Sequence, residues 1–210
     1  MSYSERGTKV MKIFKFLKRI AVHKFWVAYY CFQLGLYWQG LTHDLSKFSL
    51  TEIKGALKYW NPNKSSLAYE KELNGYSATF LHHRGRNPHH YEYWIHSLDK
   101  GGVAAEMPRK YVLELICDYL AACKTYGGNP RNEIDWWLKV SPSIKMHEKT
   151  KFYIYRVFDY FHTRPKSSLY EAVAYADVAD GLSLGDSIYS EFIEFIQYYN
   201  ERNSSSYKRL

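Results

Sequence analysis

The stretch "GLTHDLSKFS" at residues 40–49 places His43 directly before Asp44, with Lys47 three positions later. A neutral imidazole nitrogen and a carboxylate oxygen are both common ligands of transition metals, so the pair can hold a metal ion. A single His-Asp pair also arises by chance or at the polar end of a helix. Its meaning therefore depends on the other residues that could complete a site.

A second group of histidines lies in "FLHHRGRNPHHYEYW", residues 80–94. Chance predicts roughly a third of one His-His pair in a chain with this many histidines, and here two pairs fall within one short turn. One member of each pair, His83 and His90, is predicted to bind a metal, although the choice between His89 and His90 is nearly even. The other members, His82 and His89, are then expected to face a substrate or residues that support the metal ligands, and Asn87 is expected to face the substrate.

Two more residues have side chains that helical periodicity turns toward the interior. His23 follows Ile20 by three residues and precedes Val27 by four, on the apolar stripe of the first predicted helix. Asp118 shares a helical face with Leu115, and a buried carboxylate is rarely tolerated without a cation or strong donors. Each could still be an ordinary core residue bonded to a carbonyl or a hydroxyl.

The order of these residues along the chain resembles that of the HD-domain superfamily of helical metalloenzymes. In that superfamily an early His, the HD pair and a later Asp bind one metal, and the HD aspartate bridges to a second metal held by intervening histidines. The resemblance implies that one metal is bound by His23, His43, Asp44 and Asp118. It implies that the second metal is bound by Asp44 and by histidines within 82–90.

The motif "HDLSK" is similar to the HDxGK signature of the HD-GYP phosphodiesterase branch, with Ser46 in place of glycine. Lys47 then falls on the lysine that contacts phosphate in that branch. The two His-His pairs lie closer together than in that branch and no GYP motif follows, so its cyclic-dinucleotide specificity is not implied. "HDLSKFS", "HHRGRNPHHYEYW" and "MPRKYVLELICDY" together most resemble an uncharacterised family of small HD-like proteins in bacteria and phages.

These ligands favour iron, manganese, cobalt or zinc over calcium, and one or two such ions are expected. Two metals bridged by Asp44, with Lys47 beside them, predict a metal-dependent phosphohydrolase or phosphodiesterase that acts on a nucleotide or another phosphorylated molecule. An HD-type di-iron oxygenase has the same ligand order and is the first alternative. The second is a nucleic-acid-binding module with a structural metal, in which the many aromatic side chains would stack on bases.

The net charge of +8 fits a phosphate-bearing partner as well as a merely solvated surface. Lys145 and His147 precede a predicted helix and could line an anion pocket, although a surface helix start explains them better. Three cysteines without CxxC spacing indicate neither a disulfide framework nor a thiolate zinc site, which suits a reducing, cytoplasmic location. No membrane span is expected, and oligomeric state is left open.

The hydrophobic pattern predicts an all-α fold: a single HD-like helical bundle over residues 1–200, followed by a polar tail at 201–210. The first helix carries a buried stripe from Ile13 to Leu34, and the second begins at a capping box formed by Ser49 and Glu52. Further helices are expected at 65–84, from Pro88, from Pro108 to the Gly127-Gly128 pair, and at 133–139, 148–161, 169–179 and 186–199. No strand pairing is expected.

Overall fold

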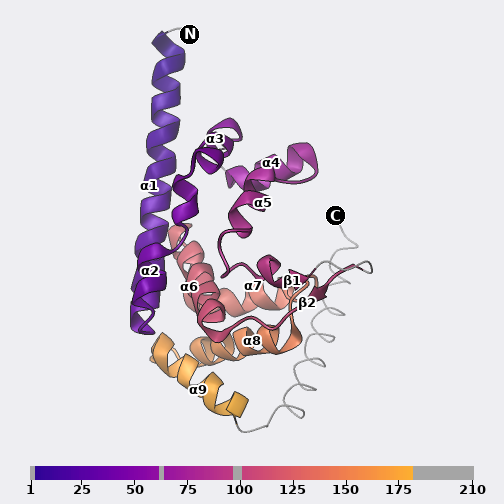
Figure 1. Cartoon of the computed structure of the whole chain (residues 1–210). Helices are drawn as coiled ribbons and strands as arrows, with labels where there is room; N and C mark the ends of the chain where they lie inside the picture. Colours follow the sequence, from indigo (N-terminus) through magenta and orange to yellow (C-terminus); the bar gives the residue numbers. More distant parts are fainter. Residues whose placement is uncertain (1–2, 62–63, 97–100, 182–210) are drawn as a thin grey trace, which may run out of the picture.

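A long N-terminal helix, α1 (Tyr3–Gln33), runs along one side of the molecule and crosses most of its length (Figure 1). The computed structural model describes residues 3–61, 64–96 and 101–181. Of the predicted stripe, Ile20 and Val27 are buried, whereas Ile13 and Phe16 are only partly buried. The helix ends at Gln33, just before Gly35 adopts a positive φ of 72°.

Helix α6 (Arg109–Thr125) packs against α1, and this helix pair forms the centre of the bundle. Its buried side chains, such as Leu115, Ile116 and Leu120, meet Val27 of α1 in the main hydrophobic core. α6 begins directly after Pro108, and Gly127, with a φ of 83°, follows its end. Both boundaries confirm the predicted helix between Pro108 and the glycine pair.

The segment after α1 folds into short elements: α2 (Tyr37–Thr42), the 3₁₀ helix η1 (Leu45–Phe48) and α3 (Leu50–Lys58). Ser49 caps α3, and its hydroxyl accepts a hydrogen bond from the amide of Glu52 at 3.3 Å. This half of the predicted capping box is confirmed. The Glu52 carboxylate, however, bonds to two histidines of another helix. The other half of the capping box, in which this carboxylate would bond to the backbone of Ser49, is therefore wrong.

The single helix predicted at 65–84 is wrong, because two helices occupy this range. α4 (Ser66–Asn74) ends at Gly75, which has a φ of 78°, and α5 (Ala78–Arg84) begins after Ser77. The Ser65 and Ser77 hydroxyls cap these helices by accepting from the amides of residues three positions later, at 3.1 and 3.0 Å. The break turns α5 toward α3, which it contacts.

The helix predicted to begin at Pro88 is also wrong. Residues 85–90 form a turn, followed by the 3₁₀ helix η2 (Tyr91–Trp94) and strand β1 (Ile95–His96). β1 pairs antiparallel with β2 (Val103–Ala104), a two-residue strand pair that the sequence did not predict. The side chain of Asn87 does not cap a helix here: its amide donates to Ser46 Oγ at 2.8 Å and to the carbonyl of His83 at 2.7 Å.

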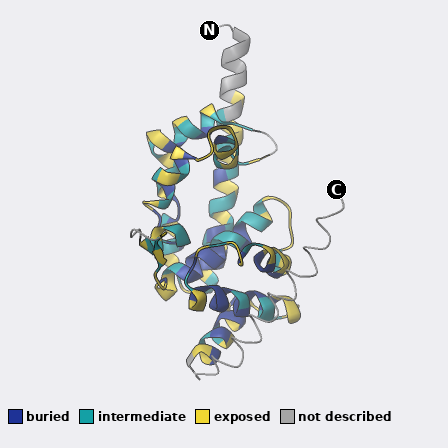
Figure 2. Cartoon of the chain, turned by 90° about the vertical axis from the view of Figure 1, so that its right-hand side faces the viewer, coloured by how far each residue is buried: buried dark blue, intermediate teal, exposed yellow. Residues whose placement is uncertain are grey.

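The remaining helices close one end of the core (Figures 1 and 2). They are the 3₁₀ helix η3 (Pro130–Asn132), α7 (Glu133–Val140), α8 (Glu148–Thr163) and α9 (Leu169–Gly181). Trp137, Ile154 and Phe158 are buried among them, which confirms the three predicted helices there. The helix predicted at 186–199 and the tail at 201–210 lie outside the described residues.

The predicted all-α class is confirmed, since helices make up nearly all of the regular structure in the described ranges. None of the helices in these ranges has both the length and the hydropathy that crossing a membrane requires.

Candidate metal centre

The predicted metal ligands come from separate elements, and the fold brings them together. His23 lies on α1, His83 on α5 and Asp118 on α6. His43 and Asp44 lie between α2 and η1. Asp44 has a φ of 55°, and among the described residues it is the one non-glycine residue with a positive φ. Such a conformation costs about 1–3 kcal/mol and is often found where a side chain must be aimed at a functional site.

One group of side chains gathers around Asp118. His23 Nε2 lies 2.9 Å from Asp118 Oδ1, and His43 Nε2 lies 3.6 Å from the same oxygen. His43 Nε2 is also 3.2 Å from Asp44 Oδ2. The fold thus brings together the four residues of the first predicted ligand set: His23 and His43 face Asp118, and His43 also faces Asp44.

A second group gathers on the other oxygen of Asp44. Its Oδ1 lies 3.2 Å from His83 Nε2 and 3.4 Å from His89 Nε2. The ring of His90 lies against both histidines, with centroids 4.8 Å from His83 and 4.4 Å from His89. The two oxygens of Asp44 therefore face two different histidine groups.

Five polar atoms of this cluster are buried and have no hydrogen-bond partner in the described part of the chain: Nε2 of His23, His43, His89 and His90, and Oδ1 of Asp44. Their short separations are ion-pair distances that lack hydrogen-bond direction. Leaving one buried polar atom unpaired costs about 1–3 kcal/mol, so five in one place are unusual. A cation between them would accept the lone pairs that no donor satisfies.

Within the described ranges, three overlapping groups have one potential ligand atom from each member within 4.8 Å of the others. Buried His and Asp side chains here could therefore hold a metal ion. The groups are Asp44 with His83, His89 and His90; His23 with His43 and Asp44; and His43 with His89 and Asp118.

Glu114 of α6 orients two of these imidazoles. Its Oε1 lies 3.0 Å from His43 Nδ1 and 3.1 Å from His89 Nδ1. Because an ionised carboxylate can only accept, each Nδ1 carries the proton and each Nε2 presents its lone pair to the cluster. The sequence analysis missed Glu114, although it lies one helical turn before Asp118 on the same face of α6.

Glu52 of α3 orients the imidazoles of His82 and His83 in the same way. Its Oε2 lies 2.8 Å from His83 Nδ1, and its Oε1 lies 3.0 Å from His82 Nδ1. His83 thus resembles His43 and His89, with Nδ1 on a glutamate and Nε2 beside Asp44. His82 is held outside the cluster by the same carboxylate.

The pKa values of the cluster report a strong demand for positive charge. Burial lowers the pKa of His83, but its contacts with the carboxylates of Asp44 and Glu52 outweigh burial and raise the pKa to about 9. Burial likewise raises the pKa of Glu114, yet hydrogen bonds from His43 and His89 bring it below its ordinary value. His90 differs: burial, assisted by the charge of His89, lowers its pKa well below the usual range. Without a metal, protons on histidines supply the positive charge that these carboxylates require.

Two lysines border the centre. Lys47 Nζ lies 2.5 Å from Asp44 Oδ2, the oxygen that also faces His43. Burial lowers the pKa of Lys47, but the charge of Asp44 outweighs burial and raises the pKa, so the ammonium stays charged. Lys24 of α1 donates to the carbonyls of His43 and Leu41, at 2.7 and 3.2 Å. These bonds fix residues 41–43 against α1.

Other residues that the sequence associated with a substrate have different positions. His89 lies inside the cluster, beside His90, and Asn87 Nδ2 lies 3.1 Å from His83 Nδ1. The structure does not bring Lys145 and His147 to the centre. Lys145 donates to the carbonyl of Gly101, and His147 is the residue that precedes α8.

Comparison with known protein families gives one match. Residues 12–160 match a family of unknown function, DUF5662. The chain belongs to this family. The matched range includes all the residues of the cluster, so the centre is part of the DUF5662 region of the chain. Searches of curated proteins and of solved structures found no significant match.

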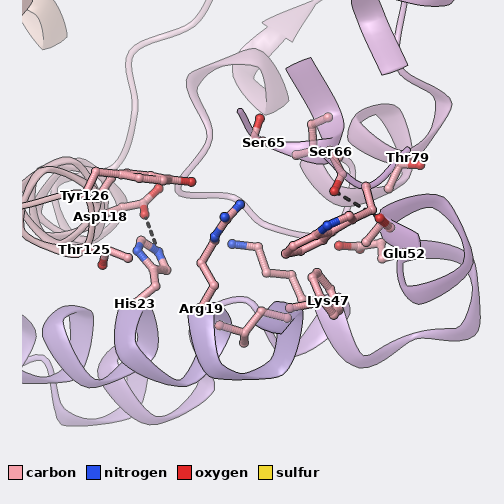
Figure 3. Close-up of a pocket in the computed structure, with 16 residues that line it drawn as sticks. Arg19, His23, Lys47, Glu52, Ser65, Ser66, Thr79, Asp118, Thr125 and Tyr126 are labelled. Atoms are coloured by element: carbon pink, nitrogen blue, oxygen red, sulfur yellow. Dashed lines mark hydrogen bonds and ion pairs between the residues drawn. The ribbon is translucent and has the colours of Figure 1, made fainter. Parts of the chain in front are cut away.

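Two cavities reach this centre of the DUF5662 fold. One, of about 250 Å³, includes His23, Lys47 and Asp118 in its wall (Figure 3). The other, of about 490 Å³, is lined by Asp44 and His89 of the cluster, with Glu114. A small molecule could therefore approach the cluster from either cavity.

Proposed function

We propose that this protein is a metal-dependent phosphohydrolase with two metal ions, and that its family is a branch of the HD-domain superfamily. The arrangement of Asp44 carries the proposal. Its Oδ1 faces His83 and His89, and its Oδ2 faces His43. A carboxylate with one histidine group on each oxygen has the geometry of a bridge between two ions.

The first ion would be held by His23, His43 and Asp44, with Asp118 beside His23 and His43. The second would be held by Asp44 with His83, His89 and His90. The Nε2 atoms of His23, His43, His89 and His90 fit this role, because they are buried and otherwise unpaired in the described ranges. Mixed imidazole and carboxylate ligands suit iron, manganese, cobalt or zinc. When bound, two such ions lower the pKa of a water between them and stabilise the leaving oxygen of a phosphate ester.

The residues of the chain supply position and charge around that chemistry. Glu114 and Glu52 hold His43, His83 and His89 in the tautomer whose Nε2 lone pair faces the centre. Lys47 now neutralises Asp44 Oδ2 at 2.5 Å, where a metal ion would compete for the same oxygen. Released from Asp44, its ammonium is placed to contact a phosphate in the adjoining cavity, as a point charge rather than a ligand.

Metal analysis of the protein purified without chelators, followed by activity assays, tests the proposal. We expect close to two transition-metal ions per chain in the wild type and a loss of both in Asp44→Asn, which keeps the shape and tolerates the backbone conformation of Asp44. Phosphate release should be measured with manganese and with iron, in air and anaerobically, from nucleoside monophosphates, nucleoside triphosphates and cyclic nucleotides. Hydrolysis that needs no dioxygen supports the proposal.

Product formed only in air, from a reduced di-iron protein, would contradict hydrolysis and favour an oxygenase. A protein that binds no transition metal would contradict both. Nucleic-acid binding that persists in Asp44→Asn without any turnover by the wild type would favour a binding module instead.

A further inference from the structure

The cavity beside His23 and Asp118 contains a cation that the proposed mechanism does not use. Arg19 lies one turn before His23 on α1, so both side chains are on the same face of the helix. In Figure 3 its guanidinium extends into the cavity that Lys47 also lines. Among the described residues, no carboxylate lies within ion-pair distance of Arg19. A guanidinium without an anionic partner, next to a metal centre, is suited to bind an anion.

Two aromatic rings flank this guanidinium. Its Cζ lies 5.2 Å from the ring centroid of Trp60 and 5.8 Å from that of Tyr126. Both rings line the cavity, and Tyr126 is labelled in Figure 3. A guanidinium stacked on rings keeps the N–H groups at its edge available for a ligand.

Three hydroxyls of the wall already have a partner within the protein. Ser66 Oγ donates to the carbonyl of Ala56, and Thr125 Oγ1 donates to that of Ala121. Ser65 Oγ accepts from an amide at the start of α4. The wall also includes Glu52, which bonds to His82 and His83, and the proposed metal ligands His23 and Asp118. The cationic groups that it offers a ligand are those of Arg19 and Lys47.

The apolar part of the wall consists of side chains from α1, α3, α4 and α6: Phe16, Ile20, Ala56, Leu67 and Ala122. The volume of the cavity, about 250 Å³, is near the lower end of the volumes of small-molecule sites. A phosphate group together with one ring system is the kind of ligand that such a wall and size suit.

We propose that this cavity binds an organic phosphate monoester with an aromatic ring. Arg19 contacts the phosphate, and the ring stacks against Trp60 and Tyr126. The inference rests on the proposed function in one respect, namely that the bound phosphate is the group that the centre cleaves. Arg19 is then a specificity-determining residue that the sequence pattern did not indicate.

Equilibrium binding of two phosphonates to the manganese-loaded protein tests this inference without turnover, because a phosphohydrolase does not cleave the C–P bond. Phenylphosphonate carries a ring and methylphosphonate does not. Stacking predicts that phenylphosphonate binds about tenfold more tightly. Arg19→Gln should weaken the binding of both ligands about 10- to 100-fold, as expected for a lost charged hydrogen bond.

Trp60→Leu should weaken only phenylphosphonate, and Trp60→Phe should restore much of that loss. Arg164→Gln is the matched control: the Cζ of Arg164 lies 4.1 Å from the ring centroid of Tyr160 and 5.8 Å from that of Tyr175, outside this cavity. It should bind both ligands like the wild type. Metal content and the circular dichroism spectrum should match the wild type in every variant that is compared.

Wild-type affinities in Arg19→Gln, or an unchanged preference for the ring in Trp60→Leu, would overturn the inference. The outcomes are separate from those of the proposed function. Ring-dependent and Arg19-dependent binding by a protein that hydrolyses no phosphate ester would support the cavity and refute the hydrolase. Hydrolysis of a phosphate ester by a protein whose phosphonate binding does not depend on Arg19 would support the hydrolase and refute the cavity.

Discussion

Single side chains in this centre hold two partners at once, and Glu114 is the clearest case. One of its oxygens accepts from both His43 and His89, which lie on different segments. The residue touches no reacting atom in the proposed mechanism, so it acts by positioning. Its removal should change metal affinity more than it changes any later step.

We expect Glu114→Gln to weaken metal binding about 10- to 100-fold, because a neutral amide oxygen is a poorer acceptor and no longer fixes both Nδ1 protons. Titration of the metal-free protein with manganese, followed by calorimetry, measures this affinity. Glu72→Gln provides the control, since Glu72 lies on α4, is exposed and pairs with Lys64. If Glu114→Gln binds manganese as tightly as the wild type, the Glu114 carboxylate is not needed for metal binding.

Lys47 should behave in the opposite way. Lys47→Ala removes a charge beside the phosphate but no metal ligand, so the metal content should persist while turnover falls about 10²- to 10³-fold. Metal analysis and kcat measured on the same sample test this separation. Lys64→Ala, which removes a lysine from an exposed ion pair, should leave kcat unchanged. If Lys47→Ala loses its metal ions, Lys47 stabilises the metal centre and its proposed role at the phosphate is contradicted.

The sequence predicted the inward-facing residues of the cluster because residue type and helical phase carry that information. His23 and Asp118 lie on apolar faces, and the pairs at 43–44 and 82–83 stand out by composition. Glu52 and Glu114 were missed because glutamates on helices are common on surfaces, and only the three-dimensional packing shows that these two are buried. A carboxylate four residues before Asp118 on one face was the available signal for Glu114.

At the scale of helices, the approach of α3 to α5 sets the position of Glu52 against His82 and His83. Gly55 allows this approach, because a Cβ at this position would lie 2.0 Å from Thr79 Oγ1 and 2.9 Å from Thr79 Cγ2. The two helices would have to separate to accept a methyl group. Such a shift would also lengthen the contacts of Glu52 with both histidines.

Gly55→Ala should therefore destabilise the protein by about 1–3 kcal/mol despite the higher helix propensity of alanine. Urea denaturation measures the loss. Thr79→Ala in the same chain removes the two closest atoms, so the double variant should recover part of that stability, and the non-additivity reports the contact. If Gly55→Ala is as stable as the wild type, or if the two changes are simply additive, α3 and α5 do not pack as closely as described.

The helix boundaries that were predicted correctly have strong local signals, such as Ser49 before α3 and Pro108 before α6. The errors occurred where tertiary contacts override such signals. Asn87 precedes Pro88 as a helix cap would, but its amide is bonded to Ser46 and to the carbonyl of His83. The turn that results places both His89 and His90 next to His83, an arrangement that a helix from Pro88 would not give.

For the molecule as a whole, the centre joins elements that are otherwise held by different contacts. α1 and α6 share the main hydrophobic core, whereas α3, α4 and α5 pack mainly on one another and on η1 (Figure 1). The proposed ligands come from both parts: His23 and Asp118 from the first, and His83 from the second. Metal binding should therefore stabilise the contact between the two parts, and not only the local geometry of the ligands.

We expect removal of the metal ions to lower the melting temperature measurably. A ligand at 100 times its dissociation constant adds about 2.7 kcal/mol, which corresponds to a shift of about 5–10 °C for a domain of this size. Differential scanning calorimetry of the chelator-treated protein, with and without added manganese, measures the shift. Asp44→Asn should melt at the same temperature under both conditions, because it lacks the bridge. A manganese-dependent shift of equal size in Asp44→Asn would place the stabilising ion elsewhere, and no shift in the wild type would show that the two parts hold together without a metal.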